Sequence, residues 1–312
     1  DDTQCCTGRT GETCTTVYGL WLFQEVLKAT GKLRYGDIME RIIYNGLFAA
    51  QEPRGRRLRY FSPPSGKREY LDRDSYCCPN NFRKGMIRLP EHIYYAWDRG
   101  FAVNLFEDSE AHITVAGGAT VHVRQSTGYP AIGTSTIVIE NLSEPCEFPV
   151  CIRVPAWCRD AAIAVNGNES EALITRRWHS GDTIRIRLPM EWRFVGGRRR
   201  QRGRAAVMRG PVVYCLSRTL NKLPEDMVLR DITLDSDSAQ TVDAERRDVL
   251  GNPGCRMRAW SPGQDTGRPP DLSLLLHEFA EPTGEEIYFK MRNPRSVIAD
   301  ELFGMQDGEG GT

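Results

Sequence analysis

The chain has 312 residues, of which 40% are hydrophobic and 26% are charged, and its 41 basic side chains balance 41 acidic ones. This composition is typical of a folded globular protein and argues against a disordered chain. A formal net charge of zero gives no reason to expect a nucleic acid or an anionic membrane as partner. No apolar run reaches the roughly 20 residues that a membrane-spanning helix needs.

The first hundred residues show the periodicity of amphipathic helices. Apolar side chains recur on one helical face between residues 16 and 30, and again between residues 35 and 50. Residues 52–76 are rich in Arg, Pro, Gly and Ser, so we expect a long loop there. A third helix is expected to begin at Pro79 and to continue to Trp97, with a kink at Pro90.

After Gly100 the period changes from 3.6 residues to two. FAVNLF and TIRIRLP alternate between apolar and other side chains, and Asn166-Gly167 is a strong signal for a tight hairpin turn. Many short strands of this kind, separated by turns, predict a β-sandwich. The basic run at residues 196–204 is expected to be an exposed loop, and LSLLL and EIYFKM predict further strands beyond residue 217.

The predicted fold class is therefore a multidomain α + β protein. We expect helices that form part of a larger helical catalytic domain in residues 1–99 and a β-sandwich in residues 100–217. A second small β-rich region with a frayed tail is expected in residues 218–312. Three helices have few partners of their own, which suggests that more of the helical domain lies upstream.

The ten cysteines include two adjacent pairs, Cys5-Cys6 and Cys77-Cys78. Neighbouring cysteines seldom bond to each other, because the ring that they would close is strained. Free thiols or thiolate ligands are the better interpretation, and they favour a reducing compartment such as the cytoplasm. We interpret Cys5 and Cys6, which lie in a loop, as incidental thiols.

Glu12, Cys14, Cys77 and Cys78 offer one carboxylate and three thiolates, a ligand set that zinc accepts. Glu12 and Cys14 can reach one ion only if the chain is extended or just turning there, because side chains two apart diverge on a helix. The second pair stands at a loop-to-helix junction, where the helix N-terminus favours thiolate. Spacing alone leaves buried or incidental cysteines as the alternative.

Several sequence blocks carry a resemblance to a known family. They are GETCTTVYGLW, DIMERIIYNGLFAAQ, YFSPPSG, YCCPNNFRKGMIRLPEHIYYAWDRGFAVNLF, RRWHSGDTIRIRLPMEWR and RGPVVYCL. In order, spacing and character they resemble glycoside hydrolase family 127, the β-L-arabinofuranosidase family. The resemblance covers about residues 9–217 and is most specific at the ETC and CCP segments.

The resemblance implies an (α/α)6 barrel followed by β-sandwich domains, and a retaining hydrolase of terminal β-L-arabinofuranosyl or related residues. It implies Zn²⁺ bound by Glu12, Cys14, Cys77 and Cys78, with Cys77 as the nucleophile that forms a thioglycosyl intermediate. Tyr60 corresponds to a region near the sugar. The family's acid/base Glu and pocket histidines lie upstream of the ETC segment, before residue 1, so we expect this chain to be inactive alone.

Other interpretations stay open. The chain can be a non-catalytic carbohydrate-binding or accessory β-sandwich protein, and the zinc site can be purely structural. His92 is expected to be a structural histidine with its hydrogen bonds satisfied. Glu40 and Arg41, which are adjacent, are expected to form an ion pair, either solvated or between helices. The remaining histidines show no ligand spacing and are expected to be structural; they are His112, His122, His179 and His277.

Overall fold

The computed structural model describes residues 10–73, 76–243 and 250–304. The chain divides into two compact units, each assembled from separate stretches of sequence. Unit 1 contains residues 1–20, 41–84 and 191–312, and unit 2 contains residues 21–40 and 85–190. Both contain helical and β residues, which confirms the multidomain α + β class. The division at residues 99 and 217 stays a prediction.

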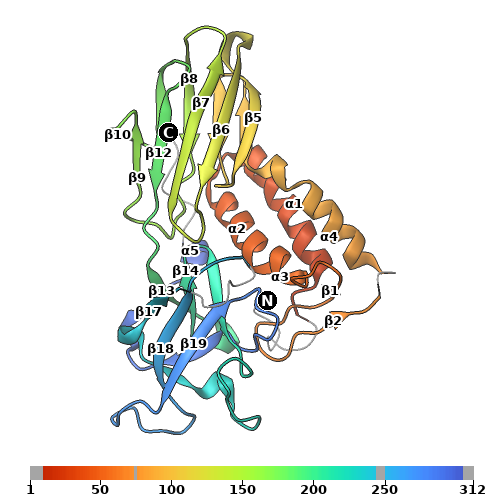
Figure 1. The fold of residues 1–312 in the computed structure, drawn as a ribbon, viewed down its shortest axis with the longest axis vertical. Helices are drawn as coiled ribbons and strands as arrows, with labels where there is room; N and C mark the ends of the chain where they lie inside the picture. The colour runs from red at the N-terminus through yellow and green to blue at the C-terminus, as the bar shows by residue number, and fades with distance from the viewer. Residues whose placement is uncertain (1–9, 74–75, 244–249, 305–312) are drawn as a thin grey trace. The chain divides into compact units, whose positions relative to one another are not determined.

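The helices gather in the first third of the chain, as the periodicity predicted. They are α1 (Thr13–Thr30), α2 (Arg34–Ile42), a π-helical turn (Ile43–Leu47), α3 (Phe48–Ala50) and α4 (Cys77–Ile87), with a short α5 (Glu301–Gly304) near the other end (Figure 1). Gly46 lies in the π-helical turn against α1, where a Cβ would stand 2.7 Å from Cγ2 of Thr16. A glycine is therefore required for this close approach.

The prediction of a helix from Pro79 to Trp97 was wrong in its second half. α4 ends at Ile87, a 3₁₀ turn covers Leu89–His92, and Tyr94–Trp97 form the strand β3. Pro90 does not kink a continuous helix, because proline disfavours helical backbone in the residue before it and cannot donate a backbone hydrogen bond. Tyr94 and Trp97, which were expected to mark a helical face, instead stand at the two ends of β3.

Unit 1 contains a nine-stranded sheet and a two-stranded ribbon. The ribbon pairs β1 (Leu58–Arg59) with β2 (Tyr70–Leu71) inside the segment that was expected to be a loop. The sheet has the order β15 (Val212–Leu216), β19 (Leu272–Glu278), β18 (Gly254–Trp260), β16 (Thr233–Leu234), β20 (Tyr288–Met291), β14 (Ala205–Arg209), β13 (Trp192–Gly196) and β21 (Val297–Ile298), and β17 (Gln240–Val242) pairs with β18. This sheet contains strands from before and after residue 217. The strands predicted at LSLLL and EIYFKM are confirmed as β19 and β20.

Two buried arginines attach the loop of residues 52–76 to the rest of unit 1. The Arg59 guanidinium donates to the carbonyl oxygens of Ala49 and Pro282, at 2.8 and 3.0 Å. The Arg68 guanidinium donates to the Phe279 carbonyl at 2.6 Å and lies 3.8 Å from the centroid of the Phe279 ring. These contacts fix Arg59 and Arg68, and with them the adjoining strands of the ribbon, within unit 1.

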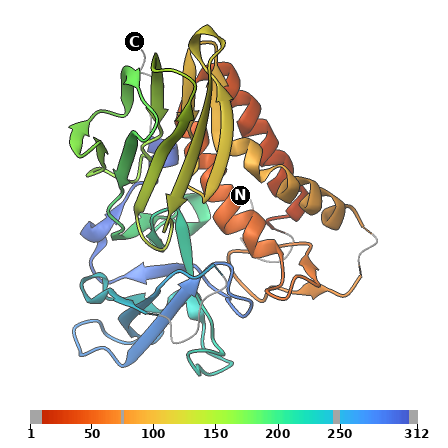
Figure 2. The same ribbon diagram turned by 45° about the horizontal axis from the view of Figure 1, so that its top comes forward.

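Unit 2 contains two sheets. One has six strands in the order β10 (Asn168–Ser170), β9 (Ala162–Val165), β12 (Thr183–Arg187), β7 (Thr134–Leu142), β6 (Thr120–Thr127) and β5 (Ser109–Thr114) (Figure 2). The other has four strands in the order β11 (Leu173–Trp178), β8 (Cys146–Ile152), β4 (Gly100–Val103) and β3.

The predicted alternation is confirmed in unit 2. On β12, Ile184 and Ile186 are buried and Arg185 and Arg187 are exposed. The hairpin at Asn166-Gly167 is also confirmed, and both residues have the positive φ that this turn requires.

Glu40 and Arg41 do not pair with each other. Glu40 is buried and accepts a hydrogen bond from Arg153 at 2.6 Å and one from the Tyr129 hydroxyl at 2.7 Å. Arg41 instead binds Asp300 at 2.8 Å and Glu301. The expected pair was wrong because side chains at adjacent helical positions point in different directions.

The remaining regular segments are short. Besides Leu89–His92, 3₁₀ turns cover Ala116–Gly118, Arg199–Gln201, Leu229–Asp231, Ser236–Ser238 and Pro294–Ser296. The turn at Arg199–Gln201 lies in the basic run that was expected to be a loop, and the side chain of Gln201 is buried. None of the helices in the described ranges combines the length and apolar character needed to span a lipid bilayer.

Candidate metal and nucleophile site

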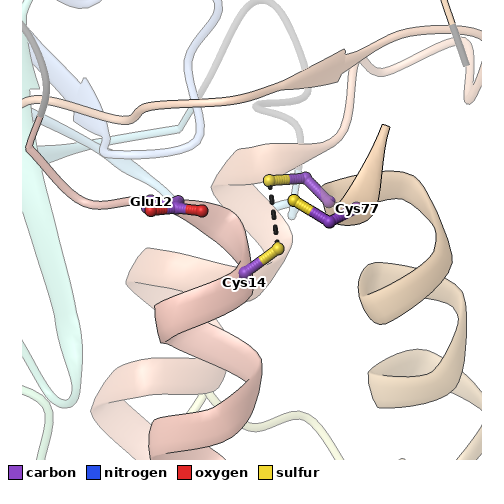
Figure 3. Close-up of side chains that lie close together, drawn as sticks. Glu12, Cys14 and Cys77 are labelled. Carbon is purple, nitrogen blue, oxygen red and sulfur yellow. Dashed lines mark hydrogen bonds between the residues drawn. The ribbon is translucent and has the colours of Figure 1, made fainter. Parts of the chain in front are cut away.

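Four side chains from two distant segments of unit 1 converge. Ligand atoms of Glu12, Cys14, Cys77 and Cys78 all lie within 4.8 Å of one another. Figure 3 shows the Glu12 carboxylate and the Cys14 sulfur at the start of one helix, with the Cys77 sulfur reaching toward them from the start of another. The structure therefore brings together all four residues that the sequence proposed as metal ligands.

The first pair of ligands is placed by a backbone contact with the loop before Cys77. Glu12 forms an isolated antiparallel bridge with Phe61, and the Thr13 amide donates to the Tyr60 carbonyl at 3.0 Å. Gly11 precedes this bridge with a φ of 68°, and a Cβ there would lie 2.7 Å from the Ser62 carbonyl oxygen. The residue before α1 is thus extended, which is the condition that lets Glu12 and Cys14 face one ion.

The second pair of ligands occupies the first turn of α4. The sulfurs of Cys14 and Cys78 are 3.3 Å apart, so the first turns of α1 and α4 lie side by side. The buried Asn81, one turn further along α4, donates from its amide nitrogen to the Cys14 sulfur at 3.2 Å. The predicted start of this helix at Pro79 was two residues late, a usual uncertainty for helix ends.

The three thiols differ in exposure and in acidity. Cys14 and Cys78 are buried, whereas Cys77 is exposed. Burial raises the pKa of both buried thiols. The pKa of Cys77 is lowered, chiefly by a hydrogen bond from Cys14 and further by one from Tyr60. Cys77 is therefore the most acidic and the most accessible thiol of the cluster, as a nucleophile must be.

Tyr60 lies beside the exposed thiol. Its hydroxyl is 3.9 Å from the Cys77 sulfur, and its ring stacks on Tyr76 with centroids 5.6 Å apart. The hydrogen bond to Cys77, together with the charge of Glu12, raises the pKa of Tyr60 to about 12. The phenol thus stays protonated and can donate a hydrogen bond to the sulfur.

The donor set fits a divalent metal ion. Sulfurs bound tetrahedrally to zinc at about 2.3 Å stand about 3.8 Å apart, close to the spacing of these atoms. Three sulfurs and one carboxylate suit zinc better than magnesium or calcium, which prefer oxygen ligands alone. These four residues could therefore hold a metal ion without a large rearrangement.

Sequence reasoning did not identify Asn81. It lies three positions after Cys78 on the same helix, so i, i+3 spacing could have identified it as a neighbour of the ligands. His92 is fully buried, but neither ring nitrogen has a hydrogen-bond partner among the described residues, so the expectation that its hydrogen bonds are satisfied was wrong for this part of the chain. Cys5 and Cys6 lie outside the described residues, and in the described part of the chain no histidine joins the cluster.

Comparison with known proteins relates this chain to a family. Residues 1–91 match the profile of the β-L-arabinofuranosidase GH127 catalytic domain, and residues 100–190 match that of the GH127 middle domain. The chain is 25% identical over 266 residues to a non-reducing end β-L-arabinofuranosidase of Bifidobacterium longum subsp. longum. That alignment covers 77% of this chain but only 40% of the relative.

Solved structures show the same fold. A GH127 β-arabinofuranosidase superposes with a TM-score of 0.79 at 24% identity, over 92% of this chain and 50% of the other. The GH127 β-L-arabinofuranosidase of Geobacillus stearothermophilus T6 gives a TM-score of 0.76 at 22% identity, over 90% of this chain and 50% of the other. The chain thus spans half or less of the length of these relatives. The two profile matches, the relative and the shared fold together show that the chain belongs to glycoside hydrolase family 127.

Proposed function

We propose that this chain is the part of a retaining β-L-arabinofuranosidase that carries the nucleophile and the zinc site. One observation supports the proposal above all: Cys77 is the exposed member of a four-residue cluster whose other two thiols are buried. The substrate class is a glycan with terminal arabinofuranosyl or related residues. The helices before residue 99 are proposed to belong to an (α/α)6 barrel, and residues 100–217 to a β-sandwich.

In the proposed reaction, the Cys77 thiolate attacks the anomeric carbon and forms a thioglycosyl bond, while the bond from that carbon to the glycosidic oxygen breaks and the leaving glycan takes a proton from a general acid. Water, which gives its proton to the same group, then displaces the sulfur from the anomeric carbon; this releases the sugar with net retention and restores the Cys77 thiolate. A zinc ion at this site would keep its cysteine ligands deprotonated at neutral pH. The remaining ligands, Glu12, Cys14 and Cys78, hold the metal, and Tyr60 is proposed to contact the sugar next to the sulfur.

A purely structural zinc site is less well supported. Structural sites usually enclose the metal among buried ligands, whereas catalytic sites leave one position accessible. Cys77 is exposed on the first turn of α4, and Tyr60 is only half-buried beside it. This accessible side is where a substrate would approach.

Glycan binding without catalysis is the second candidate function. It is favoured by an open groove of about 700 Å³ on unit 2, which lies over β5, β6 and β7. Hydroxyl side chains line this groove together with Asp108, Glu110 and Arg124, groups that bond to sugar hydroxyls. Arabino-oligosaccharide binding that is unchanged by Cys77→Ser and lost on Glu110→Gln would favour this function.

The proposed function is tested by metal analysis and by mapping of a sugar-derived label. We expect about one zinc per chain, lost in Cys14→Ser and Cys78→Ser. An electrophilic arabinofuranosyl reagent should modify Cys77, as located by peptide mass spectrometry. Cys146→Ser, which changes a partly buried thiol on β8, is the matched control and should alter neither result. Absence of zinc together with even labelling of all thiols would contradict the proposal.

A further inference from the structure

A second, smaller cavity opens in unit 1 next to the first turns of α4. It has a volume of about 130 Å³ and lies between the loop that begins at Gln51, the end of β2 and the first turns of α4. Its charged lining consists of four arginines and one carboxylate, namely Arg56, Arg57, Arg73, Arg83 and Asp72. The positive charge of this lining is well in excess of the negative charge.

Two of these arginines have no carboxylate bound to them. Arg57 is engaged by Glu52 at 2.6 Å and by Asp72 at 3.3 Å. Arg56 and Arg73 are exposed, and neither has an ion pair or a side-chain hydrogen bond within the described ranges. Their guanidinium groups therefore keep donors available for an external anion.

We propose that this cavity, which we call the arginine pocket, binds the carboxylate group of an acidic glycan. Guanidinium groups present paired donors that match the two oxygens of such a group. One water occupies roughly 30 Å³ of liquid volume, so the arginine pocket has room for a charged substituent and a few waters rather than for a whole oligosaccharide.

The arginine pocket lies against α4, the helix that also carries Cys77. Pro79, which lines it, is the third residue of α4 and stands two positions after Cys77. That separation corresponds to about 3 Å of rise along the helix. Leu58, also in the lining, accepts a hydrogen bond from the hydroxyl of Tyr76 at 3.3 Å. Side chains two positions apart point to different sides of a helix, so a glycan that reaches both the arginine pocket and Cys77 passes around the start of α4. The assignment of both positions to one glycan rests on the function proposed above.

Binding is tested with the double variant Arg56→Ser/Arg73→Ser. Calorimetry compares glucuronate with glucose, which lacks the carboxylate, and with inorganic sulfate. We expect saturable glucuronate binding that weakens at least tenfold in the double variant, and no binding of glucose. Arg185→Ser/Arg187→Ser removes the same charge from exposed positions of β12 and should leave the affinity unchanged.

Alkylation of Cys77 tests whether the arginine pocket belongs to the same substrate site as Cys77. Iodoacetate is anionic and iodoacetamide is neutral, so the ratio of their rates at Cys77 measures the attraction of an anion to this position. We expect the ratio to fall at least threefold in Arg56→Ser/Arg73→Ser and to stay constant in the control. Saturating glucuronate should slow alkylation of Cys77 by iodoacetate.

Three results would overturn the proposal. They are the absence of glucuronate binding, sulfate binding without glucuronate binding, and binding that the double variant leaves intact. Glucuronate binding with no effect on alkylation of Cys77 would overturn the assignment to the substrate site. None of these measurements requires zinc or turnover, so failure of the arginine pocket and failure of the Cys77 assignment can be told apart.

Discussion

Cys77 differs from the two other thiols of its cluster in ways that its sequence neighbours alone do not explain. Cys77 and Cys78 are adjacent, yet one is exposed and the other is buried against Cys14. Successive side chains in the first turn of a helix point about 100° apart, so Cys78 packs against Cys14 while Cys77 stays exposed at the edge of the cluster. We therefore expect Cys78 to hold the metal ion and Cys77 to be the thiol that reacts.

Asn81 should control how tightly the site holds metal. Its amide orients the Cys14 sulfur, and loss of such a supporting hydrogen bond typically weakens metal affinity 10- to 100-fold. We therefore expect Asn81→Ala to raise the dissociation constant for zinc by about 10-fold or more, measured by competition with a chromophoric chelator. Asn80→Ala changes the exposed neighbouring residue and is the matched control. Equal affinities for the two variants would refute this role.

His92 should make the protein sensitive to acid. Burial lowers its pKa to about 4; the nearby Glu91 opposes this shift, whereas Arg88 and Lys28 add to it by smaller amounts. In the unfolded chain a histidine takes up its proton near pH 6.5. Between pH 6.5 and 4 the unfolded state therefore binds a proton that the folded state does not, and the free energy of unfolding falls with decreasing pH.

We expect His92→Leu to remove this loss of stability at acidic pH. Between pH 7.0 and 4.5 the free energy of unfolding of the unmodified chain should fall by about 2 to 3 kcal/mol more than that of the variant. Urea titrations at the two pH values provide the measurement. Parallel losses in both proteins would show that the His92 ring does not titrate in this way.

At the scale of elements, α2 is attached to a strand segment of unit 2 by buried charges. Arg153, which follows β8 and is 1% exposed, binds Asp37 at 2.5 Å and Glu40 at 2.6 Å. The Asp37 carboxylate also accepts from the backbone amide of Ala156 at 3.0 Å. The polar face of α2 is therefore turned inward, although its sequence suggests a solvated helix surface.

Removal of the Arg153 cation should lower the stability of the folded protein. Arg153→Met leaves two buried carboxylates without their partner, and breaking a buried pair in this way typically costs about 3 to 5 kcal/mol. We expect a loss of that size in the free energy of unfolding, measured by denaturant titration. Arg185→Met, on the exposed face of β12, should change stability by less than about 0.5 kcal/mol. A loss of unfolding free energy below about 1 kcal/mol for Arg153→Met would mean that other groups, or protonation, neutralise the two buried carboxylates.

At the scale of the whole molecule, the candidate metal site links segments that are distant in sequence. Cys14 and Cys78 are 64 positions apart, and the structure brings their sulfurs into contact within unit 1. A bound ion would therefore stabilise the folded state, because no such cluster of ligands exists in the unfolded chain. Stability should then depend on metal as well as on packing.

Removal of metal should lower the stability of the purified chain. With zinc at a hundredfold excess over its dissociation constant, the folded state gains about 2.7 kcal/mol. We expect a zinc chelator to shift the denaturant midpoint accordingly, and re-addition of zinc to restore it. The double variant Cys14→Ser/Cys78→Ser should unfold identically with and without chelator. Coincident curves for the unmodified chain would rule out a linked metal site.

Much of the fold and of the candidate site followed from local patterns. The helices of residues 13–50, the alternation on β12 and the Asn166-Gly167 turn depend on neighbouring residues, and these predictions were confirmed. The identity of the four cluster residues came from residue chemistry and from a family resemblance, since their spacing alone was uninformative. The local sequence could not distinguish helix from strand in residues 88–97, because aromatic side chains are common in strands and also mark the buried face of a helix.

The sequence by itself determined which elements can form and which side chains can bind a metal, because propensity, period and ligand chemistry are local properties. Only the tertiary structure decided which partner each charged or thiol group meets. Glu40 binds Arg153 rather than Arg41, and Asn81 supports Cys14. Such pairings depend on how distant segments pack, and packing sets exposure, desolvation and pKa together. For that reason the exposure of Cys77 could not be predicted from sequence spacing.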